Sequence, residues 1–99
     1  MNDASLTLAD GVVQLKGAIT FSTVAGLLEQ SHQQLEWSAP LSIDLSGVRR
    51  SDSAALALLL EWRRTAMAQQ CSLTFIAPPT ALIRLAEIGG VTTLLAMEG

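Results

Sequence analysis

The spacing of apolar residues changes near residue 20, and this change constrains the fold more than any other feature of the chain. Residues 5–9 read Ser-Leu-Thr-Leu-Ala, an alternation that predicts a half-buried strand. Asp10-Gly11 follows and favours a two-residue hairpin turn, because both residues tolerate positive φ. Residues 12–15 predict the second strand, with Lys16-Gly17 closing it. The chain is therefore expected to open with a β-hairpin.

From residue 24 onwards, apolar residues recur every three or four positions, which is the spacing of one face of a helix. The members of this stripe are Val24, Leu27, Leu28, Ser31 and Leu35. Ser22 or Thr23 is expected to cap the helix by accepting a bond from a free backbone N–H. Gly26 costs about 1 kcal/mol relative to alanine inside a helix, so we interpret it as a point of close packing on the sheet.

The rest of the chain continues to alternate strand and helix. The expected segments are a short strand at 41–45, a helix from 51–53 to about 69, a long strand at 71–77, a helix at 80–88 that ends at Gly89-Gly90, and a strand or helical turn at 91–97. This order implies right-handed crossovers, and therefore an α/β fold with a mixed, mostly parallel sheet and helices packed on it. No linker or repeat interrupts the pattern, so residues 1–99 are expected to form a single domain.

Composition and charge argue against several classes of protein. The net charge of −3 disfavours nucleic-acid binding, which needs a basic surface. The longest apolar run, residues 54–60, falls short of the roughly 20 residues of a membrane span, so no direct membrane insertion is expected. Residues 1–5 lack the basic and apolar segments of a signal peptide, and none is expected. The single cysteine, Cys71, can form no internal disulfide and is expected to be a small buried hydrophobe.

The residues that carry catalysis in other proteins do not form a recognisable group here. His32 is the single histidine and has no second ligand at a metal-binding spacing. Gly89-Gly90 follows a helix, whereas a phosphate loop precedes one. Asp44 and Asp52 are the best candidates for paired carboxylates, but nothing near them in the sequence completes an acid–base pair. We therefore expect no catalytic residue, no metal site and no cofactor.

Residues 43–60 form the most distinctive segment of the sequence. A strand leads through a polar turn to Ser51, Asp52 and Ser53, three consecutive residues that can each cap a helix. In the simplest interpretation, one of them caps and the others complete the turn. Alternatively, the free N–H groups and positive dipole of the helix start form a docking point for a partner, strengthened by Arg49 and Arg50.

This segment resembles the signature of the STAS domain family. In that signature a strand ends in Asp-hydrophobic-Ser and is followed by a short turn, then Asp-Ser or Asp-Thr, two small residues and an apolar helix. Asp44, Ser46, Asp52, Ser53 and Leu56 match it residue by residue. The order of elements and the length also match, so the resemblance covers the whole chain and implies the STAS fold.

Within the family, the MlaB-type branch is the most similar, with Leu-Ala-Leu-Leu-Leu at 56–60 followed by Glu61-Trp62. This resemblance implies a non-catalytic cytoplasmic subunit, peripheral to the inner membrane, that binds the ATPase of a phospholipid-transporting ABC complex. The complex also contains a permease and a periplasmic lipid-binding subunit, and it maintains the lipid asymmetry of the outer membrane. The expected partner-binding residues are Arg49, Arg50, Ser51, Asp52, Ser53, Ala54, Leu56 and Ala57. Leu56 or Trp62 would supply an apolar anchor.

Two alternatives to a transporter subunit follow from the same residues. The anti-sigma factor antagonists of the family carry a phosphorylated serine at the position of Ser53, followed by Ser-Gly, whereas Ala54-Ala55 follow here. A kinase-controlled switch at Ser53 is therefore the second hypothesis. A phosphate- or nucleotide-binding module is the third, and it rests only on the helix start and two arginines. Gene neighbours would separate the first two.

The isolated protein is expected to hydrolyse neither ATP nor phospholipid above the background rate, because no residue pair in the sequence can act as nucleophile and base. The measurement is the release of inorganic phosphate from ATP, and of fatty acid from phospholipid vesicles, by the purified protein. Reproducible turnover that is abolished by Asp44→Ala would contradict this expectation.

Overall fold

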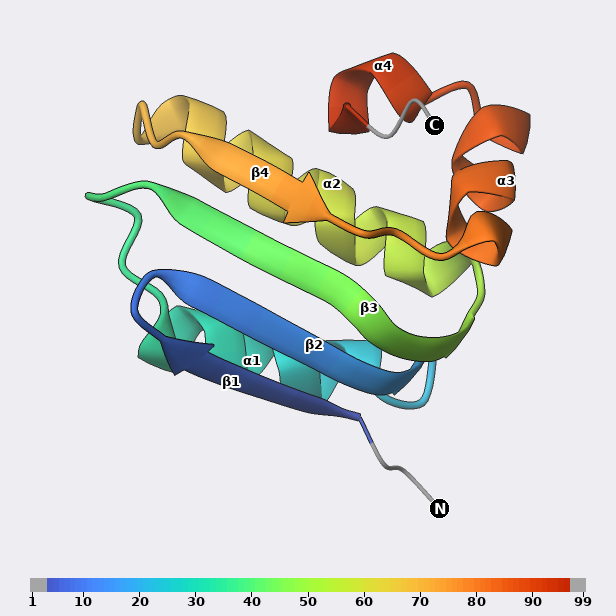
Figure 1. Ribbon diagram of the computed structural model, residues 1–99, viewed down its shortest axis with the longest axis horizontal. Helices are drawn as coiled ribbons and strands as arrows, with labels where there is room; N and C mark the ends of the chain where they lie inside the picture. Colours follow the sequence, from blue (N-terminus) through green and yellow to red (C-terminus); the bar gives the residue numbers. More distant parts are fainter. Residues whose placement is uncertain (1–3, 97–99) are drawn as a thin grey trace.

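The computed structural model describes residues 4–96, which form one four-stranded sheet with helices packed on it (Figure 1). The elements are β1 (Ser5–Ala9), β2 (Val12–Ile19), α1 (Val24–Gln34), β3 (Leu41–Ser51), α2 (Ser53–Ala68), β4 (Leu73–Ile76), α3 (Thr80–Ile88) and α4 (Thr92–Leu95). The strands lie in the order β1-β2-β3-β4. The first pair is antiparallel and the other two are parallel, so the predicted α/β class with an opening hairpin is confirmed.

The hairpin turn forms where the sequence predicts it. Asp10 and Gly11 have φ angles of 55° and 77°, the two positive values that a type I′ turn requires. The second strand is longer than predicted, because β2 continues beyond Gly17 to Ile19 and keeps pairing with β3. Its inward side chains continue to alternate through Leu15 to Ile19, and both are buried.

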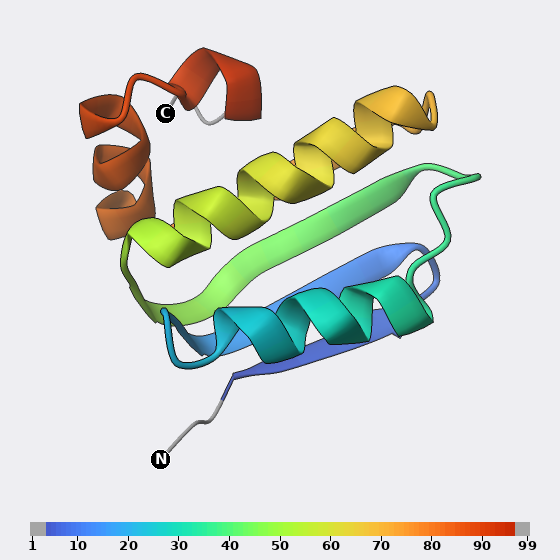
Figure 2. The same cartoon turned by 180° about the vertical axis from the view of Figure 1, so that it is seen from behind.

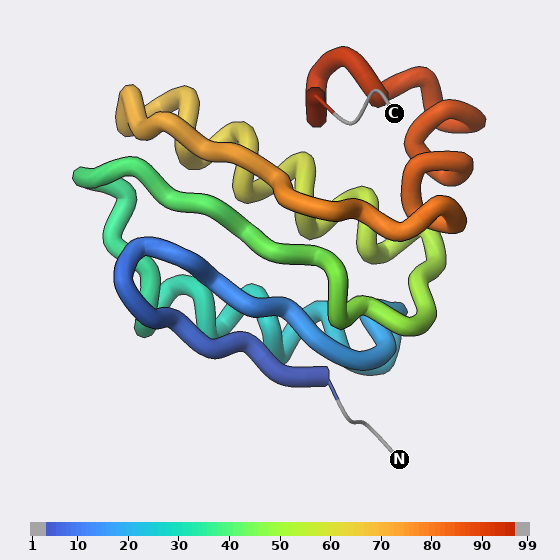
Figure 3. The backbone as a smooth tube through the Cα atoms, viewed as in Figure 1, coloured from blue at the N-terminus to red at the C-terminus, as the bar shows by residue number. Residues whose placement is uncertain are grey.

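The prediction of a short strand at 41–45 is wrong, because β3 runs on to Ser51 and replaces the expected polar turn. Two irregularities in its pairing with β2 account for the error. Gln14 and Lys16 pair with Asp44 and Gly47, so that β3 carries one extra residue there. A second extra residue lies between the partners of Gly17 and Ala18. Such bulges break the alternation of burial and bend the strand, and Figure 3 shows β3 bending near its carboxyl end.

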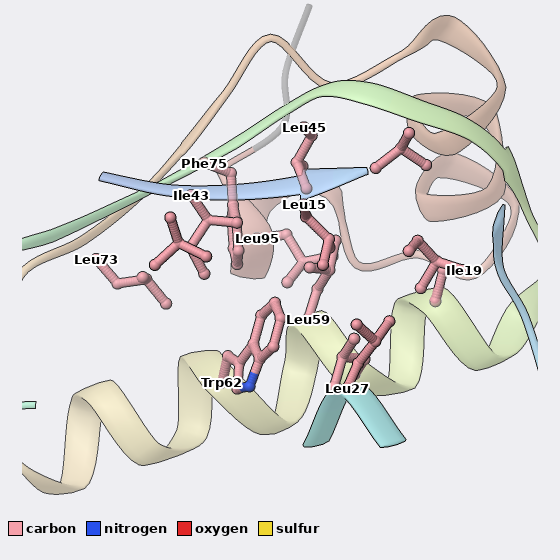
Figure 4. Packing of buried hydrophobic residues seen from close by; sticks show 14 of the residues in the cluster. Leu15, Ile19, Leu27, Ile43, Leu45, Leu59, Trp62, Leu73, Phe75 and Leu95 are labelled. Atoms are coloured by element: carbon pink, nitrogen blue, oxygen red, sulfur yellow. The ribbon is translucent and has the colours of Figure 1, made fainter. Parts of the chain in front are cut away.

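Helices α1 and α2 lie on the same face of the sheet, as Figures 1 and 2 show from opposite sides. The inward residues of β2 and β3 point to them, and in Figure 4 the labelled Leu15 and Ile43 lie above Trp62 of α2. Trp62 is only 1% exposed. The core is otherwise mainly aliphatic, and each buried Leu or Ile contributes about 1.5–3 kcal/mol of burial free energy.

The carboxyl-terminal part closes the core beside β4. The predicted long strand at 71–77 is wrong in extent, since β4 covers only Leu73–Ile76, and half-buried Cys71 precedes it. Gly90 has the expected positive φ, and the ambiguous segment forms the helical turn α4, whereas Met97 lies outside the described residues. Arg63 connects α2 to β4 and to α4, because it donates to the carbonyl oxygens of Leu73 and Leu95 at 2.9 and 3.3 Å.

Gly26 does not pack closely on the sheet, which contradicts the interpretation made from the sequence. It is exposed, and a Cβ added to it would meet no atom within 4 Å. The conformational cost of this glycine within α1 is therefore not offset by any contact among the described residues.

Gly26→Ala is expected to raise the free energy of unfolding by about 1 kcal/mol, because alanine lowers the entropy cost of forming α1 and meets no obstacle. For a domain of this size the thermal midpoint should rise by roughly 4–8 °C. Gly90→Ala is the matched control. It also enters open space, but its φ of 73° makes a side chain unfavourable, and stability should fall by about 1 kcal/mol. A Gly26→Ala protein less stable than the wild type would contradict the assignment of Gly26 as unpacked.

Candidate partner-binding surface

Asp52 connects the two segments that meet at the carboxyl ends of β2 and β3. One carboxylate oxygen, Oδ1, accepts the N–H of Ala54 at 2.8 Å and so caps α2. The other, Oδ2, accepts the N–H of Phe21 at 3.2 Å, and the backbone N–H of Asp52 donates to the carbonyl oxygen of Ile19 at 3.3 Å. Of the three candidate caps in the sequence, Asp52 is the one that caps the helix.

Thr23 stabilises the loop between β2 and α1, but its side chain does not cap α1. Thr23 occupies the N-cap position, but its side chain makes no capping bond to α1. Its hydroxyl instead donates to the carbonyl oxygen of Ala18 at 2.7 Å and accepts the N–H of Thr20 at 3.0 Å. The prediction that Ser22 or Thr23 caps the helix through its side chain is therefore wrong for Thr23, whose hydroxyl shapes the loop that carries Phe21.

The structure brings the predicted partner-binding residues into one continuous segment, but they differ in accessibility. Arg49, Arg50, Ser53 and Ala57 are exposed, Ser51, Asp52 and Leu56 are half-buried, and Ala54 is buried. Ser51 ends β3 and Ser53 is the first residue of α2, as the predicted helix start requires. Although residues 54–60 are all apolar, Ser53 and Ala57 lie on an open side of α2.

The apolar anchors proposed from the sequence, Leu56 and Trp62, differ in accessibility, because Leu56 is half-buried and Trp62 is buried. Trp62 is buried, so its use as an anchor is wrong, and Leu56 lies against α3, where its Cδ1 would be 3.6 Å from a Cβ on Gly89. Phe21 and Ile88 are instead 78% and 85% exposed. The sequence carries a weak signal for both, since Phe21 lies beyond the strand alternation and Ile88 lies outside the buried Leu82–Ala86 side of α3.

Two hollows lie side by side at this end of the molecule and share Ser51. The first, of about 440 Å³, lies between the 18–23 segment and Arg50. The second, of about 510 Å³, lies between Ser51 and α3, where Arg84 and Ile88 line it. In Figures 1 and 2 the loop after β2, the end of β3 and the start of α3 lie at the same end of the sheet. The surface is open and shallow, which suits a protein contact better than an enclosed small molecule.

Asp44 and Ser46 match the family signature but lie within β3 rather than at the helix start. The Oδ1 atom of Asp44 accepts the backbone N–H of Ser46 at 2.9 Å. Hydrogen bonds from the backbone and side chain of Ser46 hold the pKa of the Asp44 carboxyl below its ordinary value, and nearby Lys16 acts in the same direction. The bonds between the charged Asp44 carboxylate and Ser46 stabilise the bulged part of β3. The two residues are not part of the surface around Ser53.

Two features of other protein classes are absent from the described residues. Within residues 4–96, no three His, Cys, Asp or Glu side chains come together to hold a metal ion. No helix among these residues has the length and apolar character to cross a membrane.

Comparison with known proteins gives a family match and a fold match. The family model described as "Mlab, STAS domain" matches residues 2–96. The crystal structure of Mglu is similar to 77% of the chain, with a TM-score of 0.60 and 19% identity, and the native form of Mglu to 75%, with a TM-score of 0.58 and 17% identity. The chain spans only about a fifth of these larger proteins, 20% and 22% of their lengths, so the likeness shows the fold alone. Curated protein sequences gave no match.

Asp52→Asn is expected to keep the helix cap but break the link to the loop. Asparagine caps helices as well as aspartate does, but one of its two terminal atoms is an NH₂ group that cannot accept the Phe21 N–H. Hydrogen exchange of the Phe21 amide should therefore become faster, with little change in the thermal midpoint. Asp52→Ala removes both bonds and should also lower stability by about 1 kcal/mol. Unchanged exchange at Phe21 in the Asn variant would mean that Asp52 does not hold the loop.

Proposed function

Because the chain belongs to the family of MlaB-type STAS domains, we propose that it is a non-catalytic subunit that binds the ATPase of a phospholipid-transporting ABC complex. In this role it lies in the cytoplasm and is peripheral to the inner membrane through its partner. The complex, with its permease and periplasmic lipid-binding subunits, maintains the lipid asymmetry of the outer membrane. The contact surface is centred on Ser53 and includes the neighbouring residues 49–52, Ala54, Leu56 and Ala57.

One observation supports this surface above the others. Asp52 supplies the capping bond of α2, so the exposed hydroxyl of Ser53 is not required to cap the helix. A small polar side chain is thus presented at the helix start, where the positive end of the dipole favours carbonyl or carboxylate groups of a partner. The N–H groups of Ala54 and Ala55 already bond to Asp52, so the Ser53 hydroxyl is the group offered to the partner.

The side chains around Ser53 allow a partner to approach closely. Ala57 lies one turn further along α2 and is also exposed, so this strip of the helix carries only small groups. Beneath it, Leu58 and Leu59 are buried and fix the helix on the sheet. A rigid helix with a small-residue strip can form a well-packed interface without a large loss of side-chain entropy.

The exposure of Ser53 at the start of a helix also supports a second candidate function. A phosphate at this position would be stabilised by the helix dipole and would add negative charge to the surface. This favours the hypothesis of a kinase-controlled switch of the anti-sigma factor antagonist type. The two functions differ in the protein that is captured, which is either a transporter ATPase or a serine kinase with its sigma factor.

Ser53→Asp is expected to weaken ATPase binding by about a hundredfold and to leave the thermal midpoint unchanged. Aspartate suits the first turn of a helix, so the fold tolerates it. At a covered interface, however, an unpaired carboxylate costs a few kcal/mol, and about 1.4 kcal/mol is a tenfold change in affinity. Affinity is measured with the purified ATPase subunit of the transporter, and cells carrying the variant should become detergent-sensitive.

Ser72→Asp is the matched control, because Ser72 is an exposed serine that precedes β4, away from the start of α2. Glu29→Gln on the exposed side of α1 is a second control. Both should bind as the wild type does. A well-folded Ser53→Asp protein with normal affinity would exclude the surface around Ser53, and a wild-type protein that does not bind the ATPase would exclude the proposed function.

A further inference from the structure

Two apolar side chains and two arginines flank the Ser53 segment from elements outside α2. Phe21 lies on the loop before α1, Ile88 and Arg84 lie on α3, and Arg50 lies near the end of β3. The two hollows described above join them, since Arg50 and Phe21 line the first, Arg84 and Ile88 line the second, and Ser51 belongs to both. The four side chains therefore border one surface, although they come from three separate parts of the sequence.

Phe21 and Ile88 are the most exposed of the large apolar side chains among residues 4–96. A single exposed apolar residue is ordinary on a protein surface and needs no explanation. Two of them on either side of the same residue, Ser51, form an exposed apolar pair at one end of the sheet, and such groupings mark interaction sites.

Arg50 and Arg84 give this surface a positive charge on a chain whose net charge is −3. No ion pair joins either of them to another residue within the described 4–96. The nearest acid in the sequence to Arg50, Asp52, already accepts N–H groups on both carboxylate oxygens. Glu87 is the acid closest in sequence to Arg84, and it forms no ion pair with it. Among residues 4–96, both exposed guanidinium groups are therefore available to pair with an acidic partner.

We propose that the partner contacts this surface with an acidic face, in which carboxylates pair with Arg50 and Arg84 while apolar pockets receive Phe21 and Ile88. This proposal rests on the proposed function and specifies its partner chemistry: the ATPase presents Asp or Glu side chains between apolar depressions. Arginine and aromatic side chains at the centre of an interface supply most of its binding energy, and the small residues Ser53 and Ala57 permit the approach. Arginine also pairs with a carboxylate through two parallel hydrogen bonds, which fixes the orientation of the partner.

An anionic membrane is the other surface that combines negative charge with apolar depth, and the composition disfavours it. Electrostatic attachment to lipid typically uses clusters of about 4–8 Lys or Arg residues, whereas this surface has few basic residues and contains Asp52.

The test compares charge reversal and apolar removal with matched changes elsewhere, using the purified transporter ATPase as the probe. Arg50→Glu combined with Arg84→Glu should lower affinity at least a hundredfold and reduce its dependence on salt concentration. Phe21→Ser and Ile88→Ser should each lower affinity about tenfold or more. Arg64→Glu and Met67→Ser are the controls, because Arg64 and Met67 are exposed on the second half of α2, and both should bind normally. Circular dichroism melting confirms that every variant is folded.

The outcomes separate this proposal from the proposed function. If Ser53→Asp abolishes binding but the four changes at Phe21, Arg50, Arg84 and Ile88 leave affinity intact, the acidic-partner proposal is wrong and the function stands. If the wild-type protein does not bind the ATPase, both fall. Sedimentation with phosphatidylglycerol vesicles tests the lipid alternative. Vesicle binding that is lost in the Arg50→Glu, Arg84→Glu protein while its ATPase affinity is normal would assign this surface to the membrane and overturn the proposal.

Discussion

The parallel pairing of β2 with β3 is the interaction on which both the fold and the candidate site depend. Because the two strands run in the same direction, their carboxyl ends meet at one edge of the sheet. Ile19 lies beside Ser51, and the chain turns into α1 after the first and into α2 after the second. The same pairing fixes both helices on one face, where the apolar side chains of the sheet can be covered. Asp52 then uses one carboxylate to hold the two turns together, so that the surface around Ser53 is built from segments more than thirty residues apart in the chain.

The elements specified by local signals were predictable, and those specified by pairing were not. Asp10-Gly11, the stripe of α1 and the start of α2 at Ser53 depend on residues close in sequence, and the structure confirms them. The length of β3 depends on two bulges, and no residue type between 46 and 50 predicts them. The bulges interrupt the alternation of burial from which a strand is recognised in a sequence. The assignment of Phe21 and Ile88 as proposed anchors depends on which residues of distant elements share a surface, which spacing along one element cannot reveal. The prediction of Trp62 as an anchor is wrong for the same reason, because an apolar run does not indicate which side of the helix packs on the sheet.

The core contacts of α2 and its proposed contact surface use different side chains of the helix. Its second half holds Trp62 in the core and Arg63 against β4 and α4, where the guanidinium also lies 5.1 Å from the ring of Phe75. Burial lowers the pKa of Arg63 from its ordinary value, but the group stays charged at neutral pH, since ordinary arginine titrates far above it. The first half exposes Ser53 and Ala57. Substitutions at Ser53 and Ala57 can therefore alter the surface without disturbing the packing that holds the helix in place.

The two bulges of β3 have a consequence for how this chain can change in length during evolution. One residue separates Gln14 from Lys16 in β2, whereas two separate their partners Asp44 and Gly47. Loss of Ser46 would restore one-to-one pairing and leave Leu45 and Val48 facing the helices. Loss of a residue from β2 would turn part of that strand over, because adjacent side chains in a strand point to opposite faces. Loss of one residue at a bulge of β3 should therefore be tolerated, whereas the same loss from β2 should not, and shortening among descendants of this sequence should occur in β3.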